Sequence, residues 1–235
     1  MIKKNDKKLA VCRLQMQLRR LKIYSGLIDG QFGSGTDSAV REYQQKRGLS
    51  VDGIVGPYTD SKLKSETDSG LFVLFLHCAA TPEGRDVKGS AVASWHTNPK
   101  PNGRGWSRPG YSDVIELDGT LVNLREWNQD DKISEWEYTF GVKFETLLNR
   151  NARHVCYIGG TEPDNVYAPK DTRTDAQKRV MELYIKWNLV RNPDLIIAGH
   201  NQVQPKACPS FLVPQYLRSI GIPEWNIANW GLLYE

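Results

Sequence analysis

Apolar residues near the start of the chain recur every three or four positions, which is the spacing of a helix that buries one face. The first run consists of Val11, Leu14, Leu18 and Leu21. Val40 and Tyr43 mark a second, shorter helix, and a third is expected over about residues 59–63. Short helices joined by Gly-containing turns predict a small three-helix bundle over residues 1–66.

Two similar turns separate these helices. The segment "IDGQFGSGT" at residues 28–36 is repeated as "VDGIVGPYT" at residues 51–59. An Asp-Gly pair favours a tight turn because glycine accepts a positive φ, and a threonine a few residues later can begin a helix. Each copy therefore predicts a turn followed by a helix start.

After the polar stretch "KSETDSG", which we expect to be a linker, the pattern changes to that of strands. The runs "LFVLFLHC", "RHVCYIGG" and "DLIIAGH" are typical of buried strands, and "YSDVIELDGTLVNL" predicts two strands around an Asp-Gly turn. Before the last run, Thr174 and Gln177 fit a capping box that opens a helix. Its expected apolar face comprises Val180, Leu183, Tyr184 and Trp187. Residues 67–235 are thus predicted to form an α/β mixed sheet flanked by helices.

Composition and charge limit the classes of function. Hydrophobic residues make up 40% and charged residues 25% of the 235 residues, as in ordinary globular proteins. The net charge of +4 is spread along the chain without a nucleic-acid motif, so we expect no nucleic acid partner, whereas an anionic polymer such as a bacterial cell wall fits. No apolar core follows the first charged residues, and the longest apolar run is too short for a bilayer. We expect no signal peptide, no integral membrane segment and synthesis in the cytoplasm.

Two histidines and a cysteine are the candidate metal ligands. His77 lies at the end of the first apolar strand, His200 at the end of the last, and Cys208 follows in the next loop. If these strands are neighbours, the three side chains meet at one edge and form a zinc set with an open fourth position. The alternative interpretation is that such residues are structural, and we interpret His96 and His154 in that way, as structural or surface residues.

Several motifs together resemble a known enzyme family. "FLHCAAT", "GYSDVIELDGT", "VCYIGG" and "GHNQVQPKACPSF" occur in the order found in type-2 N-acetylmuramoyl-L-alanine amidases, which include small phage enzymes and peptidoglycan recognition proteins. This resemblance spans about residues 70–219. The D-G-x-x-G-x-x-T repeat similarly resembles the peptidoglycan-binding domain that accompanies many cell-wall hydrolases. The whole chain therefore resembles a modular phage endolysin.

The resemblance implies roles for individual residues. It implies Zn²⁺ as the cofactor, with the ligands falling on His77, His200 and Cys208, the active-site tyrosine on Tyr111 and the catalytic lysine on Lys206. The chain departs from the family at Ser112, where histidine is frequent, in a longer and more aromatic segment at 127–153, and in a C-terminal tail from residue 223. We expect these departures to affect substrate preference more than the reaction, and we expect the tail to pack on the domain or line its groove.

The implied activity is hydrolysis of the amide bond between N-acetylmuramic acid and L-alanine in peptidoglycan. The enzyme is expected to be a monomer that reaches the wall once the membrane is permeabilised. Two alternatives remain open at this stage: a catalytically weak peptidoglycan-binding protein of the same fold, and a zinc peptidase that cuts within the stem peptide.

Overall fold

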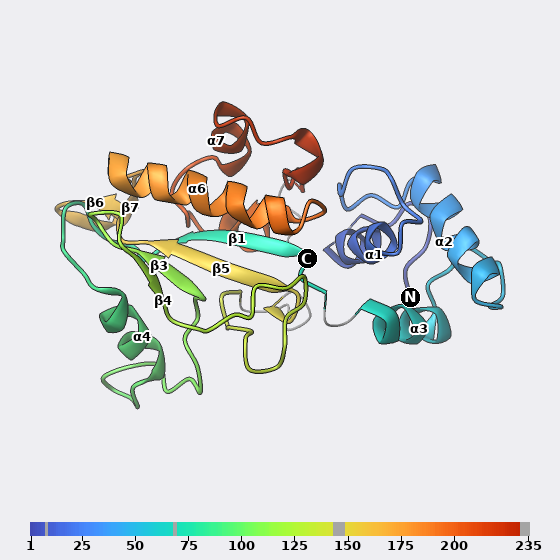
Figure 1. Ribbon diagram of the computed structural model, residues 1–235, viewed down its shortest axis with the longest axis horizontal. Helices are drawn as coiled ribbons and strands as arrows, with labels where there is room; N and C mark the ends of the chain where they lie inside the picture. The colour runs from blue at the N-terminus through green and yellow to red at the C-terminus, as the bar shows by residue number, and fades with distance from the viewer. Residues whose placement is uncertain (8, 68–69, 143–148, 231–235) are drawn as a thin grey trace.

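The computed structural model describes residues 1–7, 9–67, 70–142 and 149–230. Its N-terminal part contains the three expected helices, α1 (Leu9–Arg20), α2 (Ser34–Lys46) and α3 (Pro57–Thr67), at one end of the molecule (Figure 1). The third helix is longer than the sequence predicted. It continues to Thr67, so the first part of the expected linker is helical, and the prediction of a polar coil from Lys64 was wrong there.

A buried glutamine holds each of the two repeated turns. Gln44 donates through Nε2 to Asp52 Oδ1 at 2.8 Å and to the Ile54 carbonyl at 3.0 Å, and its Oε1 accepts from the Gly53 N–H at 2.9 Å. Gln15 makes the corresponding bonds in the first copy, to Asp29 Oδ1, the Gln31 carbonyl and the Gly30 N–H. The repeat therefore includes a glutamine on the preceding helix.

The repeated threonines have a different role from the predicted one. The helices α2 and α3 begin at Ser34 and Pro57, before Thr36 and Thr59. Both threonines are buried, and each hydroxyl lies within hydrogen-bonding distance of the glutamine of its own repeat. They secure the turns and do not cap the helices.

A five-stranded mixed sheet forms the centre of the remaining chain, in the order β4-β3-β5-β1-β8. Its strands are β1 (Val73–Cys78), β3 (Asp113–Ile115), β4 (Leu121–Asn123), β5 (Ala152–Tyr157) and β8 (Ile196–Gly199). All pairings are parallel except β3 with β4, which are joined by the predicted Asp-Gly turn. A smaller sheet contains β2 (Thr81–Pro82), β6 (Gly160–Glu162) and β7 (Asn165–Pro169). This arrangement confirms the predicted fold class.

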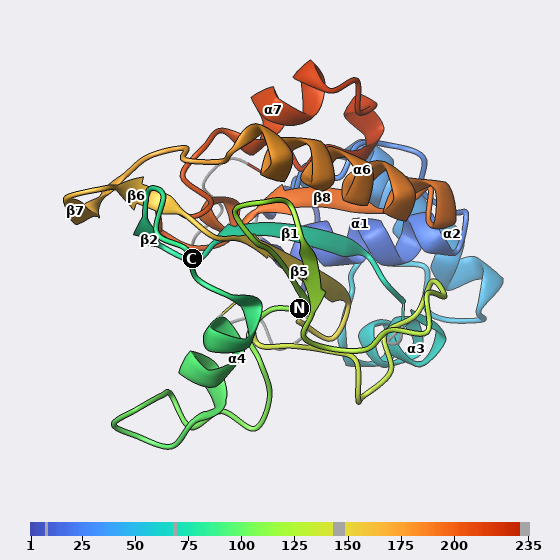
Figure 2. The same ribbon diagram turned by 60° about the vertical axis from the view of Figure 1, so that its left-hand side comes forward.

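Helices lie on both sides of the main sheet. Figures 1 and 2 show α6 (Asp175–Arg191) and α7 (Val213–Ser219) on one side and α4 (Gly89–Thr97) on the other. Two short 3₁₀ helices, η1 (His200–Gln202) and η2 (Glu224–Asn226), complete the described elements. No helix in the described ranges is long and apolar enough to cross a membrane.

The helix α6 confirms one prediction and corrects another. Its capping box is present, with Gln177 N–H donating to the Thr174 hydroxyl and the Gln177 side chain accepting from the Thr174 N–H. The predicted buried face was wrong at Leu183 and Trp187, which are 62% and 39% exposed. The face that packs on the sheet instead contains Met181, Tyr184 and Ile185. The helix therefore has a second apolar stripe outside the core.

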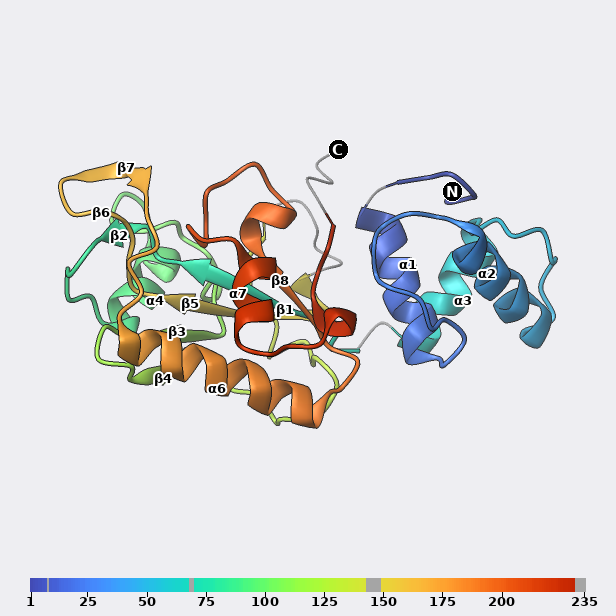
Figure 3. The same ribbon diagram turned by 90° about the horizontal axis from the view of Figure 1, so that it is seen from above.

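The N-terminal helices and the sheet share one apolar core. Cys12 and Met16 of α1 belong to the same buried cluster as Val73 and Phe75 of β1 and the tail residue Trp230. Figure 3 shows α1 as the N-terminal helix nearest the sheet. The described part of the C-terminal tail therefore packs on the domain, as one of the two expectations had it, while residues 231–235 lie outside the described residues.

Polar contacts reinforce this junction. Arg19 of α1 donates to the Trp225 carbonyl at 3.2 Å, and its guanidinium lies 3.6 Å from the Trp225 ring centroid. Trp230 Nε1 donates to the Ile28 carbonyl at 2.9 Å. Lys22 forms an ion pair with Asp194. The tail therefore connects the sheet region to the N-terminal helices.

Candidate metal centre

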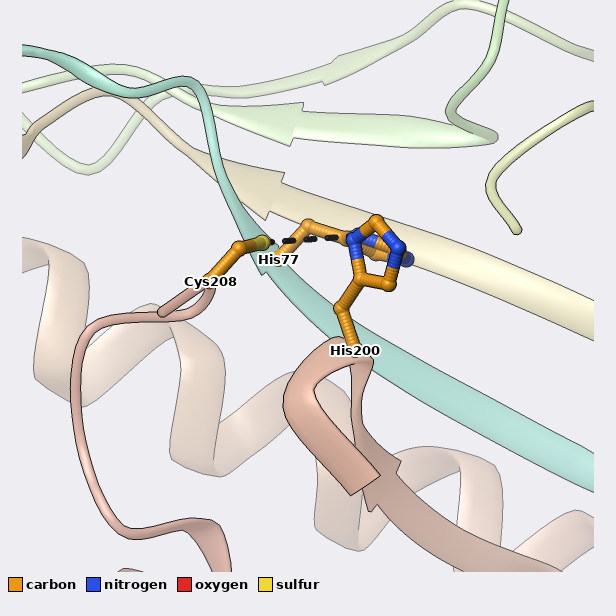
Figure 4. Close-up of side chains that lie close together, drawn as sticks. All are labelled: His77, His200 and Cys208. Atoms are coloured by element: carbon orange, nitrogen blue, oxygen red, sulfur yellow. Dashed lines mark hydrogen bonds between the residues drawn. The ribbon is translucent and has the colours of Figure 1, made fainter. Parts of the chain in front are cut away.

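Three potential metal ligands converge at the carboxyl end of the parallel strands. The ligand atoms of His77, His200 and Cys208 all lie within 4.8 Å of one another. Figure 4 shows the three side chains close together at the end of β1. The two Nδ1 atoms of the histidines are 3.1 Å apart, and Cys208 Sγ is 3.7 Å from His77 Nδ1. The structure thus brings together the three residues that the sequence proposed as ligands.

Strand pairing explains why these residues meet. β1 and β8 are parallel neighbours with Leu76 opposite Gly199, so the residues that follow, His77 and His200, emerge side by side. The loop after η1 then returns Cys208 to the end of β1, where the Cys78 N–H donates to Cys208 Sγ at 3.2 Å. The Cys208–Pro209 peptide bond is cis, and the Pro209 carbonyl accepts from the Tyr157 hydroxyl at 2.8 Å. The cysteine is therefore held by neighbouring strands although it lies in a loop.

Each histidine turns Nδ1 toward the cluster, while its other nitrogen has a partner. His77 Nε2 lies 3.0 Å from His154 Nδ1, and His200 Nε2 is hydrogen-bonded to Gln204 Oε1. Since an amide oxygen only accepts, His200 carries its proton on Nε2 and presents the Nδ1 lone pair. A partner on the second nitrogen is the usual arrangement around histidines that bind metal. The bond to Gln204 therefore favours the tautomer of His200 that a metal requires.

His154 is a buried residue, which agrees with the structural one of the two interpretations that the sequence offered. It is fully buried and stacks on Phe75 with a centroid separation of 5.2 Å. The role of Gln204 was not predicted from the sequence. The alternation of side chains along β5 could have indicated the position of His154. His77 pairs with Cys156 across the strands, and His154 lies on the same sheet face as Cys156, two residues away.

Electrostatics keep the imidazoles neutral. Burial lowers the pKa of His77 well below its ordinary value, with further lowering from His200, His154 and Lys206. Burial also lowers the pKa of His200 to about 4. Both rings are therefore uncharged at neutral pH and can offer a lone pair. Burial raises the pKa of the Cys208 thiol, and a cation bound at the cluster would lower that pKa again. Two imidazoles and one thiolate match the ligands that zinc prefers, so the residues present fit this ion.

Tyr111 and Lys206 flank the cluster at different depths. The Tyr111 ring lies 4.9 Å from the His77 ring between centroids and is half-buried. Burial raises the pKa of Tyr111 well above its usual value, so its hydroxyl stays protonated and can donate. Lys206 is exposed, and its ammonium is close enough to lower the pKa of both histidines. A substrate group at the cluster would meet a phenol inside and a cation at the rim.

His96 supports Tyr111 and does not join the ligand set. Its ring lies edge-on to Tyr111 at 5.1 Å and stacks on Trp106 at the same centroid distance. His96 Nδ1 accepts from the Gly110 N–H at 3.2 Å. This residue lies on α4 and fixes the loop that presents the tyrosine.

Both parts of the chain are similar to known proteins. Residues 8–63 match the family model described as a putative peptidoglycan binding domain. The endolysin of Escherichia phage T7 is 27% identical over 150 residues, covering 64% of this chain and 85% of the relative. The spore cortex-lytic enzyme of Bacillus cereus is 34% identical over 103 residues, covering 43% of this chain and 38% of the relative. The predicted resemblance to phage endolysins with an N-terminal peptidoglycan-binding domain is confirmed.

Solved structures agree on the fold. The structure titled "Endolysine N-acetylmuramoyl-L-alanine amidase LysCS" from Clostridium intestinale has a TM-score of 0.50 at 15% identity and covers 66% of this chain and 87% of its own. The bumblebee peptidoglycan recognition protein PGRP-SA also has a TM-score of 0.50, at 14% identity, and covers 72% of this chain and 95% of its own. The sheet region of this chain therefore has the fold of these proteins.

Proposed function

We propose that this protein is a zinc-dependent peptidoglycan hydrolase that cleaves the amide bond between N-acetylmuramic acid and L-alanine, and that it acts as an endolysin. The observation that carries the proposal is the convergence of His77 Nδ1, His200 Nδ1 and Cys208 Sγ. The chain also contains a segment that matches the peptidoglycan-binding family, and its similarity to phage endolysins covers most of their length. These observations together favour hydrolysis of the cell wall.

The chemistry divides between the ion and the side chains around it. Zn²⁺ held by His77, His200 and Cys208 would supply Lewis acidity and lower the pKa of water to about 7. Tyr111 then donates a hydrogen bond to the substrate carbonyl or to the attacking water. The Lys206 ammonium stabilises the negative charge that develops on the carbonyl oxygen. His154 and Gln204 keep the two ligand rings in the required orientation.

The N-terminal domain is proposed to bind the substrate polymer. We assign this role to residues 1–66, with residues 67–235 as the catalytic domain. The polymer is a bacterial cell wall, which the enzyme reaches after the membrane is permeabilised. The net charge of +4 of the whole chain favours binding to an anionic wall.

Product analysis of defined substrates tests the proposal. The purified chain is incubated with sacculi and with soluble muropeptides, and the products are identified by mass spectrometry. We expect separate glycan and peptide products, with L-alanine as the new amino terminus, and loss of this activity with a chelator or in Cys208→Ser. A cut inside the stem peptide would identify a peptidase. Binding to sacculi without any cut would identify a binding protein, and full activity without metal would exclude the zinc mechanism.

A further inference from the structure

A cavity lies on the opposite face of the main sheet from the candidate metal centre. It has a volume of about 760 Å³ and is bordered by β4, α6 and the segment at 126–136. Leu74 and Leu76 of β1 pack in the core with Tyr184 of α6, so the alternating residue His77 faces the other way. The volume is in the range of ligand pockets, which run from about 300 to 1,000 Å³. This cavity is therefore separate from the proposed reaction site.

Three tryptophans give the cavity flat apolar walls. Trp127 and Trp187 meet edge to face, with ring centroids 5.8 Å apart at 80°. Trp136 remains 47% exposed and Trp187 39% exposed, although both line the cavity. Leu183, the neighbour of Trp187 on the second stripe of α6, is 62% exposed. Folding leaves these surfaces available to a ligand that has its own apolar face.

The floor of the cavity contains buried polar groups with unused donors. Arg153, whose side chain is 2% exposed, forms an ion pair with Asp113 at 2.6 Å, and Asp113 also accepts from the Tyr184 hydroxyl at 2.6 Å. In the described part of the chain, Arg153 Nε and Nη1 and Trp127 Nε1 are buried without hydrogen-bond partners. A buried donor without a partner has lost its hydrogen bond to water and gained none in return, which destabilises the protein. A ligand with neutral oxygen acceptors would relieve this cost.

Charge and rim chemistry narrow the class of ligand. Asp113 and Glu126 offset the charge of Arg153, so the lining does not favour an anion. The rim carries the side-chain amides of Asn128 and Gln129, each of which both donates and accepts hydrogen bonds. A lipid would leave the buried donors of Arg153 and Trp127 without partners. A sugar ring has apolar C–H faces for the tryptophans and hydroxyl groups for the amides.

We propose that this cavity is a saccharide-binding site that takes an N-acetylated amino sugar of the glycan strand. The acetamido carbonyl would accept from the unused donors of Arg153 or Trp127, while the sugar ring stacks on Trp136 or Trp187. The choice of an N-acetylated sugar rests on the proposed function, whereas the saccharide class rests on the lining of the cavity. The catalytic domain would then hold glycan on the sheet face that does not carry the metal centre.

Tryptophan resonances provide a test that is specific to this site. The full-length protein is labelled with ¹⁵N-tryptophan and titrated with the trimer of N-acetylglucosamine. We expect the indole N–H signals of Trp127, Trp136 and Trp187, assigned by substitution, to shift together. Trp136→Ala and Trp187→Ala should each weaken binding about tenfold, equivalent to about 1.4 kcal/mol. Val190→Ala is the matched control, because Val190 is an exposed apolar residue of the same helix that does not line the cavity.

Each outcome separates this proposal from the proposed function. Absence of shifts, shifts confined to other tryptophans, or equal affinity of the variants and the parent would overturn the saccharide site. A sugar-free stem peptide that shifts the same signals while the trimer does not would overturn it in favour of a peptide site. Failure to release peptides from sacculi would overturn only the amidase, because the titration requires no reaction. Thermal unfolding of each variant confirms that the substitution leaves the protein folded.

Discussion

Gln44 holds the second Asp-Gly turn, and its replacement by alanine should lower the free energy of unfolding by about 3 kcal/mol. The side chain is 1% exposed and makes three short bonds, to Asp52, to the Ile54 carbonyl and from the Gly53 N–H. A net contribution of about 0.5–1.5 kcal/mol for each bond gives this figure. Domains of ordinary stability have only about 5–15 kcal/mol in total, so the loss is large.

Urea titration of the full chain measures this effect, with Gln45→Ala as the control. Gln45 is the next residue on α2 and is exposed, so its replacement should change stability by less than about 0.5 kcal/mol. Far-UV circular dichroism reports all helices, whereas tryptophan fluorescence reports the sheet region and its junction with α1, because Trp95 is the first tryptophan and Trp225 and Trp230 lie at that junction. Equal losses in Gln44→Ala and Gln45→Ala would refute the role of the buried amide. If the unfolding transitions seen by both signals move to lower urea concentration together, the shared core couples the two parts.

Three further predictions concern the site. Gln204→Ala removes the acceptor of the His200 ring and should lower zinc affinity about 10- to 100-fold, measured by competition with a chelating dye; unchanged affinity would contradict the orienting role. Tyr111→Phe should lower kcat about 100-fold or more with little change in KM on soluble muropeptides, while a change in KM alone would assign the hydroxyl to binding. Burial lowers the pKa of His96 to about 4, so the unfolded state binds more protons between pH 6.5 and 4. His96 should therefore contribute about 3 kcal/mol to the loss of stability as the pH falls from 6.5 to 4, beside the contributions of His77, His154 and His200, whose pKa values burial also lowers. Urea titrations at both ends of this interval should show a smaller loss in His96→Gln; an equal loss in the variant and the parent would exclude a contribution from His96.

The sequence was most informative where local chemistry decides the structure. The Asp-Gly turns, the continuous apolar strands and the capping box at Thr174 were all predicted because each depends on a few adjacent residues. The helix α1 shows the limit of such patterns. Its polar residues Gln15, Gln17 and Arg19 are buried together with the apolar ones, because the helix lies between its own bundle and the sheet. Periodicity describes one buried face and does not reveal a helix that is covered on several sides.

The metal ligands of the site were predicted from the sequence, but the residues that support them were not. His77 and His200 were predicted to meet because strands that end in histidines bring them to one edge when they are neighbours. The supporting roles of His154 and Gln204 depend on ring orientation, which no spacing encodes. The exposure of Trp187 was also missed, because an apolar residue at helical spacing looks the same whether it faces a core or a cavity.

The core that α1 shares with the sheet determines how far the enzyme can reach. Two domains on a flexible tether sample every bond within the tether length, which raises the effective concentration over a whole neighbourhood. A junction built from Met16, Phe75 and Trp230, with Arg19 stacked on Trp225, instead holds the proposed wall-binding domain and the metal centre at a fixed separation. From one anchored position such an enzyme reaches only the bonds that lie at that separation. The rate of lysis would then be limited by dissociation and rebinding of the N-terminal domain. Stronger binding of that domain to the polymer would therefore slow lysis.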